Sequence, residues 1–200
     1  DAVGAPRAGA ELPTAAYPTM RLRHDILRPF ANEHPNADGR GVLIGVLDSG
    51  IDPSVPGLQF TTDGKRKLLD LRDLSGEGRI ELTRIMPRND SLSLHGQHLG
   101  GAARAMALAS DGAIWAGILA ETPLGAAPAA DLDGNGVVGD SLMVLVVRGR
   151  AGWLLLADTA RDGTLTNDTG VRDFGVAGES FGWSTDGEPS PLHLAINFGE

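Results

Sequence analysis

The sequence has no cysteine, little positive charge and no long apolar run. Without cysteine there can be no disulfide bonds, thiolate metal ligands or cysteine nucleophile. Lysine and arginine number 17 against 26 acidic residues, giving a net charge of -9. Because no basic patch stands out, we expect no nucleic-acid partner. No apolar run approaches the ~20 residues of a membrane-spanning helix, so no membrane span is expected.

What remains is typical of a globular protein. The 200 residues suffice for one large domain or two small ones, and the content of 42% hydrophobic and 22% charged residues is ordinary. The 28 glycines and 12 prolines predict many turns. The chain begins at Asp1 instead of Met, as after removal of a leader. We expect an extracellular or periplasmic location.

The residue pattern changes along the chain. Residues 1–20 are rich in Ala, Gly and Pro and predict an extended arm. Residues 21–33 predict a short helix that Pro29 limits or kinks. A second strand candidate lies at residues 67–73. The fold class predicted for this opening part is α/β.

From about residue 75, short apolar segments alternate with turn signals. They predict four strands, at residues 79–85, 113–120, 141–147 and 152–158. Within the last two, residues 144–147 and 153–156 flank a five-residue loop at residues 148–152, which favours a β-hairpin. Residues 122–130 are a connector rich in Pro and Ala. The later part of the chain is therefore predicted to be mostly β.

The most informative stretch is residues 41–52, where an apolar run ends in an acid. Residues 42–47 are β-branched and bounded by glycines, which predicts a strand buried on both faces. The carboxyl ends of such strands open onto ligand-binding crevices in α/β sheets. A carboxylate there, Asp48, needs a partner, such as a histidine held in one tautomer. Alternatively, Asp48 caps a turn with its side chain.

This stretch resembles the start of the catalytic domain of subtilisin-like serine peptidases. Residues 48–52 (DSGID) resemble the aspartate box of that family. Residues 52–78 resemble more closely one branch, tripeptidyl peptidase II and its bacterial relatives. The resemblance implies that residues 21–78 begin a parallel-sheet catalytic domain. It also implies that Asp48 is the catalytic aspartate, which orients a histidine.

The resemblance further implies a long insertion between the aspartate box and the histidine box. Residues 79–190 resemble this insertion, and residues 191–200 resemble the strand that returns toward the histidine box. The triad histidine and serine are then expected beyond Glu200, in the order Asp, His, Ser. This segment alone is expected to be inactive. The insertion could serve oligomer assembly, access control or substrate gating.

An alternative catalytic base is His95. The sequence His-Gly-Gln-His at residues 95–98 has the outline of the histidine box, which opens a helix in the family. Gln97, Leu99 and Arg104 depart from that box, and adjacent glycines begin a helix poorly. The segment resembles better a part of the insertion that has no catalytic role. We therefore interpret His95 as an insertion residue, and His24, His34 and His193 as surface or packing residues.

Residues 178–182 match the Gly-x-Ser-x-Gly nucleophile elbow around Ser180. That motif needs a strand before it, a helix after it, and an acid and a histidine downstream. His193 is the only histidine that follows in this sequence. We interpret the segment as a turn built on small residues.

An acidic loop is a candidate metal site. Asp131, Asp133 and Asn135 place oxygen atoms at alternate positions, Gly136 permits a sharp turn, and Asp140 could close the shell. Calcium binds to such compact oxygen-rich loops. Leu142 stands where an EF-hand has its bidentate acid, so this is not an EF-hand. The other interpretation is a turn that leads into the following strand. Asp158 and Asp162-Gly163 form a similar loop with fewer oxygen-bearing side chains.

Two functions follow from these observations. The first is peptide hydrolysis through a serine acyl-enzyme, with a peptide or protein substrate and the remainder of the catalytic domain as partners. It requires no cofactor, although a structural calcium ion is compatible with it. The second is a non-catalytic binding or assembly module, in which the β-rich region is an interaction surface. An oligomer is compatible with both functions.

Overall fold

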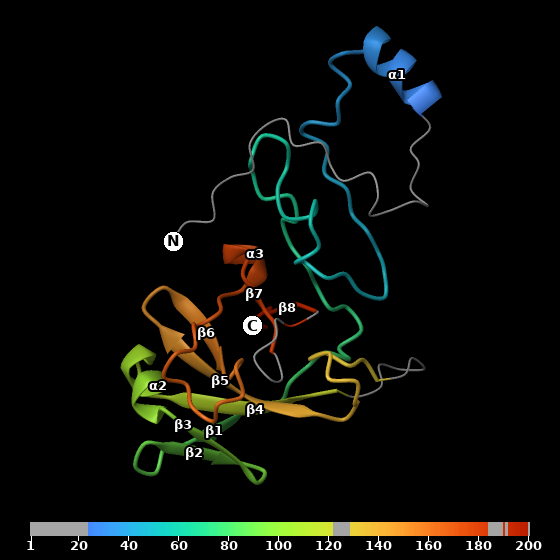
Figure 1. Ribbon diagram of the computed structural model, residues 1–200. Coiled ribbons are helices and arrows are strands. Elements are labelled where there is room, and N and C mark those ends of the chain that lie inside the picture. The colour runs from blue at the N-terminus through green and yellow to red at the C-terminus, as the bar shows by residue number, and fades with distance from the viewer. Residues whose placement is uncertain (1–23, 122–128, 184–189, 191, 200) are drawn as a thin grey trace. The chain divides into compact units, whose positions relative to one another are not determined.

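The computed structural model describes residues 24–121, 129–183, 190 and 192–199 (Figure 1). The chain forms two units, Asp1–Ile51 and Asp52–Glu200. The structure mixes helices with strands, and its named strands pair antiparallel. No helix in the described part of the chain is long and apolar enough to cross a membrane. The arm predicted at residues 1–20 and most of the connector at residues 122–130 lie outside the described residues.

The first unit contains the predicted helix but not the predicted strand. Helix α1 spans His24–Glu33 and includes Pro29. Residues 42–47 belong to no sheet, and Leu43 and Leu47 are 78% and 91% exposed. The prediction of a doubly buried strand is therefore wrong for this structure. A central strand needs neighbours on both edges and layers on both faces. The described residues of this unit contain no strand with which residues 42–47 could pair.

The second unit is built on a four-stranded sheet. Its order is β1 (Thr83–Ile85), β4 (Ile114–Ala120), β5 (Ser141–Gly149) and β6 (Gly152–Ala157). The four strands predicted from the apolar segments are thus confirmed. All neighbours pair antiparallel, so the parallel sheet implied by the resemblance is not among the described strands.

Two local predictions in this unit were wrong. Residues 67–73 form no strand, and Leu69 within them is 52% exposed. The β5–β6 hairpin is confirmed, but its loop is shorter than predicted. Strand pairing continues to Gly149 and Gly152, which leaves a two-residue turn at Arg150 and Ala151.

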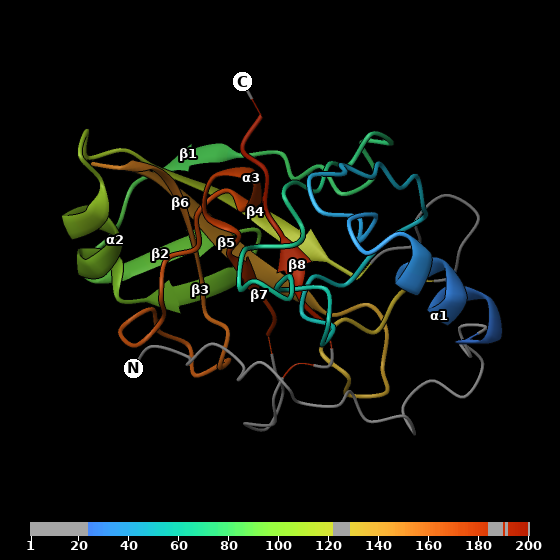
Figure 2. The same cartoon turned by 90° about the horizontal axis from the view of Figure 1, so that it is seen from above.

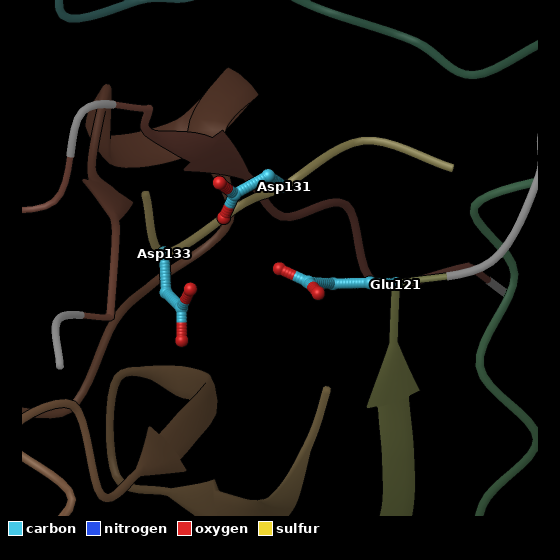
Figure 3. A group of neighbouring side chains, drawn as sticks. All are labelled: Glu121, Asp131 and Asp133. Atoms are coloured by element: carbon cyan, nitrogen blue, oxygen red, sulfur yellow. The ribbon is translucent and has the colours of Figure 1, made fainter. Parts of the chain in front are cut away.

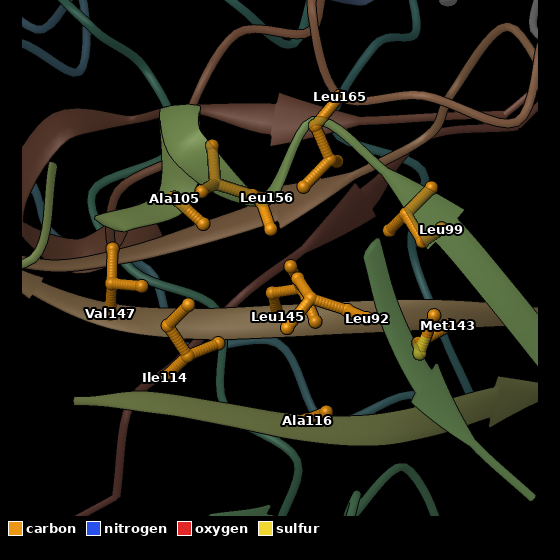
Figure 4. Close-up of a cluster of buried hydrophobic side chains, with 11 residues drawn as sticks. Leu92, Leu99, Ala105, Ile114, Ala116, Met143, Leu145, Val147, Leu156 and Leu165 are labelled. Atoms are coloured by element: carbon orange, nitrogen blue, oxygen red, sulfur yellow. The ribbon is translucent and has the colours of Figure 1, made fainter. Parts of the chain in front are cut away.

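Strand β5 is buried on both faces. Met143, Leu145 and Val147 point into one apolar cluster, beneath the hairpin of β2 (Ser91–Leu94) and β3 (Gln97–Gly100) and beside α2 (Ala102–Leu108) (Figure 4). The cluster also contains Leu92, Leu99, Ala102, Ala105, Ile114, Ala116, Leu156 and Leu165. Burying each large apolar side chain contributes roughly 1.5–3 kcal/mol. This layer therefore holds the hairpin and α2 on the sheet.

The other face of the sheet carries a second apolar cluster. Leu142 and Val144 of β5 pack there with Leu155, Phe181 and Trp183. The cover includes β7 (Ser180–Phe181) and β8 (Leu194–Ala195), which pair with each other. Seen from above, β7, β8 and α3 (Phe174–Ala177) lie over the sheet (Figure 2). The β5 run therefore has both of the layers that residues 42–47 lack.

Candidate functional site

Asp48 lies in an exposed segment of the first unit. Its Oδ1 accepts hydrogen bonds from the Ser49 backbone N–H at 2.6 Å and from the Ser49 hydroxyl at 3.3 Å. The carboxylate is thus hydrogen-bonded to the residue that follows it. Its catalytic role stays a prediction.

His95 occupies the turn of the β2–β3 hairpin. Leu94 pairs with Gln97, and the two residues between them have positive φ angles, 49° at His95 and 83° at Gly96. Positive φ at both central residues is the conformation that a tight two-residue hairpin requires. The next helix, α2, begins only at Ala102. The His-Gly pair thus closes a hairpin and opens no helix. Whether His95 acts as a base stays untested.

Ser180 of β7 and His193, the residue before β8, are brought together by the pairing of these strands. The Ser180 hydroxyl lies 3.3 Å from Nδ1 of His193, and β7 pairs antiparallel with β8. The segment before Ser180 is helix α3, which ends at Gly178 with a φ of 69°. A nucleophile elbow connects a strand to a following helix. Here the helix precedes the strand, so the elbow is not formed.

The acidic loop gathers carboxylates from two segments of the chain. Glu121, Asp131 and Asp133 each offer an oxygen within 4.8 Å of the others (Figure 3). Glu121 directly follows β4 and is only 4% exposed. The sequence interpretation missed this residue. The sequence pattern that could have indicated Glu121 is an acid directly after an apolar segment. The same pattern indicated Asp48.

Two of these carboxylates organise the loop through its backbone. Asp131 accepts N–H hydrogen bonds from Gly134 at 2.7 Å and Gly136 at 2.8 Å. Glu121 accepts them from Leu132 at 2.6 Å and Asp140 at 3.1 Å. The carboxylates therefore hold the backbone of the loop in place through its N–H groups.

The remaining predicted ligands join the same network. The Asp133 side chain has 0% exposure and forms a 3.0 Å ion pair with Nη1 of Arg161. The Asn135 amide donates to Asp133 at 3.2 Å and to Asp140 at 2.5 Å. The four predicted residues thus lie in one network. The oxygen donors suit calcium, but Arg161 already supplies a positive charge, so an ion would have to share these carboxylates with it.

A hollow of about 420 Å³ adjoins this network. His98 of β3 lines it together with Asp140, Asp158 and Arg161. Nδ1 of His98 lies 2.8 Å from the Ser93 hydroxyl. Asp158 accepts the Gly163 N–H at 2.7 Å. Most polar groups of this hollow are thus engaged with the protein itself.

A second hollow, of about 360 Å³, contains Asp168, Glu179 and Ser180. Asp168 is 8% exposed, and burial raises the pKa of its carboxyl group. Hydrogen bonds from the Thr159 N–H at 3.0 Å and hydroxyl at 2.8 Å act in the opposite direction. The charges of Asp158 and Asp162 raise this pKa further. The hollow therefore contains an acid that is poorly stabilised in its charged form.

Parts of the chain are similar to known peptidases. The identity is 45% over 67 residues with tripeptidyl-peptidase 2 of Oryza sativa subsp. japonica, and 42% over 79 residues with that of Arabidopsis thaliana. These matches cover 34% and 40% of this chain but only 5% and 6% of the relatives. Pyrolysin of Pyrococcus furiosus is 46% identical over 44 residues, which are 22% of this chain and 3% of that protein.

No family profile matches the chain, and no solved structure is significantly similar to it. The similarities to the curated proteins nevertheless confirm the predicted resemblance to the tripeptidyl peptidase II-like branch of subtilisin-like serine peptidases. The chain spans only a small part of the length of these relatives.

Proposed function

We propose that this chain is the amino-terminal portion of a subtilisin-like serine peptidase of the tripeptidyl peptidase II type. The observation that carries the proposal is the similarity to tripeptidyl-peptidase 2 from several organisms, at 42% identity over 79 residues in one case. In this proposal residues 48–52 are the aspartate box. Asp48 is the triad member that orients the histidine.

The exposure of residues 42–47 supports the proposal. Val42, Leu43, Ile44, Val46 and Leu47 are between 67% and 91% exposed. Exposed apolar surface forgoes roughly 25 cal/mol of stabilisation per Å². In the proposed enzyme, the remainder of the catalytic domain supplies the neighbouring strands and the covering layers, which turns this segment into a central strand of a parallel sheet. Asp48 then reaches the carboxyl edge of that sheet.

The proposed chemistry is hydrolysis of peptide bonds. The histidine removes the proton from the serine hydroxyl, and the serine attacks the carbonyl. The C–N bond then breaks as the histidine gives the proton to the leaving amine. Water hydrolyses the acyl-enzyme that remains. Asp48 accepts a hydrogen bond from the histidine, holds it in the reactive tautomer and stabilises its charged form. For this purpose Asp48 exchanges its present hydrogen bonds with Ser49 for one with the histidine. The segment alone is inactive, because it supplies only the aspartate.

In the same proposal, residues 79–190 are an insertion in the catalytic domain and residues 191–200 lead back to it. The enzyme acts on a peptide or protein substrate in an extracellular or periplasmic location. It requires no cofactor. A structural calcium ion at Asp131, Asp133, Asn135 and Asp140 is part of the proposal, and the proximity of the Glu121, Asp131 and Asp133 oxygens supports it.

The second candidate is a non-catalytic binding or assembly module. The hydrogen bonds from Ser49 to Asp48 favour it, because in them the carboxylate has a local partner other than a histidine. Incubating the full gene product with a fluorophosphonate probe separates the two. We expect one serine outside these 200 residues to be labelled. No labelling of a folded gene product would favour the module.

A further inference from the structure

Helix α3 is the point at which two distant segments of the second unit meet. It is a single turn, Phe174–Ala177. Arg66 contacts it from the segment that follows the aspartate box. Residues 196–198 contact it from the end of the chain. The three segments belong to the same unit.

Arg66 binds to α3 through its guanidinium group. Nη1 donates to the Phe174 carbonyl at 2.8 Å, and Nη2 donates to the Gly175 carbonyl at 2.9 Å. Nη2 also donates to the Leu69 carbonyl of its own segment at 2.7 Å. The guanidinium carbon lies 5.7 Å from the centre of the Phe174 ring. The Arg66 side chain thus joins carbonyl groups of its own segment to carbonyl groups of α3. Arg66 and Phe174 are 108 residues apart in the sequence.

The glycines of α3 allow this close approach. A Cβ atom on Gly178 would lie 2.6 Å from Cδ and 2.8 Å from Nη1 of Arg66. A Cβ atom on Gly175 would lie 2.9 Å from a carboxylate oxygen of Asp70. Real Cβ contacts are essentially never this short. A Cβ atom at either position would therefore displace the side chain of Arg66 or Asp70 from its present place.

Asp173 joins α3 to the end of the chain. Its Oδ2 accepts the Phe198 N–H at 2.9 Å, while its Oδ1 accepts the Val176 N–H at 3.3 Å as the helix cap. The Phe174 N–H donates to the Ile196 carbonyl at 2.8 Å. The returning segment is thus held at the start of α3, while Arg66 binds to carbonyl groups of the same turn.

We propose that Arg66 is a positioning residue. Together with Asp173 it fixes the β module, residues 79–190, between the incoming segment, residues 52–78, and the returning segment, residues 191–200. This inference rests on the proposed function, in which residues 52–78 and 191–200 connect the module to the catalytic domain. If both connections are bound to α3, the module cannot turn freely about them. It then keeps one orientation toward the rest of the enzyme. In that orientation it restricts the approach of long peptides to the catalytic site.

Hydrogen exchange on this chain tests whether Arg66 holds α3. In Arg66→Ala, we expect the Phe174 and Phe198 amides to exchange about tenfold faster, because the bonds that hold α3 in place are lost. The β5 amides should keep their rates. Arg66→Lys should be intermediate, since an ammonium group cannot span the carbonyls as a planar fork does. Unchanged exchange in Arg66→Ala would overturn the proposal.

Arg79→Ala is the matched control. Arg79 forms an ion pair with Glu81 at 2.9 Å, and its side chain is 75% exposed. Its removal deletes the same charge without touching α3. We expect the Phe174 and Phe198 amides of this variant to exchange at the wild-type rate. If Arg79→Ala accelerated them as much as Arg66→Ala, the effect would be one of charge, and the proposal would be overturned.

Kinetics of the full gene product test the positioning role. In Arg66→Ala, we expect KM for a long peptide to rise about fivefold, while kcat and the rate of fluorophosphonate labelling stay near wild type. Faster exchange with unchanged KM would overturn the positioning role and leave the proposed function intact. If the wild-type product were not labelled at all, the proposed function would fail together with the claim about substrates. The exchange rates would still decide whether Arg66 holds α3.

Discussion

Arg161 and Asp133 form an ion pair of 3.0 Å in which the carboxylate side chain has no exposed surface and the arginine side chain is one-third exposed (33%). The same arginine lies 3.8 Å from Asp140. The Arg161 cation therefore lies beside two of the four residues that the sequence predicted as calcium ligands. This relationship determines how stability and metal binding of the loop are expected to respond to substitution.

Replacing Arg161 with Ala should destabilise the second unit by about 2 kcal/mol, because it leaves a desolvated carboxylate without its ion pair. The expected loss of stability is smaller than for a fully buried ion pair, since Arg161 is partly exposed. Chemical denaturation measures the change in the free energy of unfolding. Lys65→Ala is the control: its ion pair with Asp63 is exposed (80% and 46%), so we expect a much smaller loss. Equal losses would contradict the prediction.

Calcium should raise the melting temperature of a sample stripped with EDTA. At a calcium concentration one hundred times the Kd, binding to the folded state alone would stabilise it by about 2.7 kcal/mol. Asp131→Asn should abolish the increase. Asp111→Asn is the control, because Asp111 caps a turn through the Ala113 N–H and is not among the predicted ligands. No shift in wild-type protein on adding calcium would refute the site.

Asp168→Asn should remove a pH dependence of stability. Burial raises the pKa of Asp168 above its ordinary value of 3.8. The folded state therefore binds this proton more tightly than the unfolded chain, and stability falls as the pH rises from 3.8 through the raised pKa. An asparagine oxygen can still accept both hydrogen bonds from Thr159. We expect the variant to be at least as stable as wild type at pH 7.

The measurement for Asp168 is denaturation at a series of pH values. The difference in unfolding free energy between Asp168→Asn and wild type should grow in favour of the variant as the pH rises through that window, then stay constant. A variant that lost stability relative to wild type as the pH rose would contradict the sign of the pKa shift.

Asp48 and His95 should differ sharply in the full gene product. Asp48→Asn should lower kcat by about 10⁴-fold, because the histidine would be held in the wrong tautomer. His95→Ala should retain activity, since His95 lies in a hairpin turn. Peptidase assays on both variants measure the effects. Loss of activity in His95→Ala with normal folding would instead identify His95 as the base.

Local patterns were sufficient for much of the second unit. The alternation of apolar segments with turns predicted β4, β5 and β6, and their pairing confirms the hairpin. The oxygen-rich loop was also visible, because its members lie close together in the sequence. Glu121 was missed, since it reaches the loop only through the pairing of β4 with β5.

Two similar apolar runs show what the sequence alone determined and what it did not. The composition of residues 42–47 and of residues 141–147 predicts a buried strand in both cases. Burial is a property of the surrounding layers, however, and only the tertiary structure supplies them. Residues 141–147 lie between two apolar clusters, while residues 42–47 stay exposed. The sequence alone also determined the resemblance to a peptidase family. The tertiary structure decided which polar groups meet, because partners such as Arg66 and Phe174 are far apart along the chain.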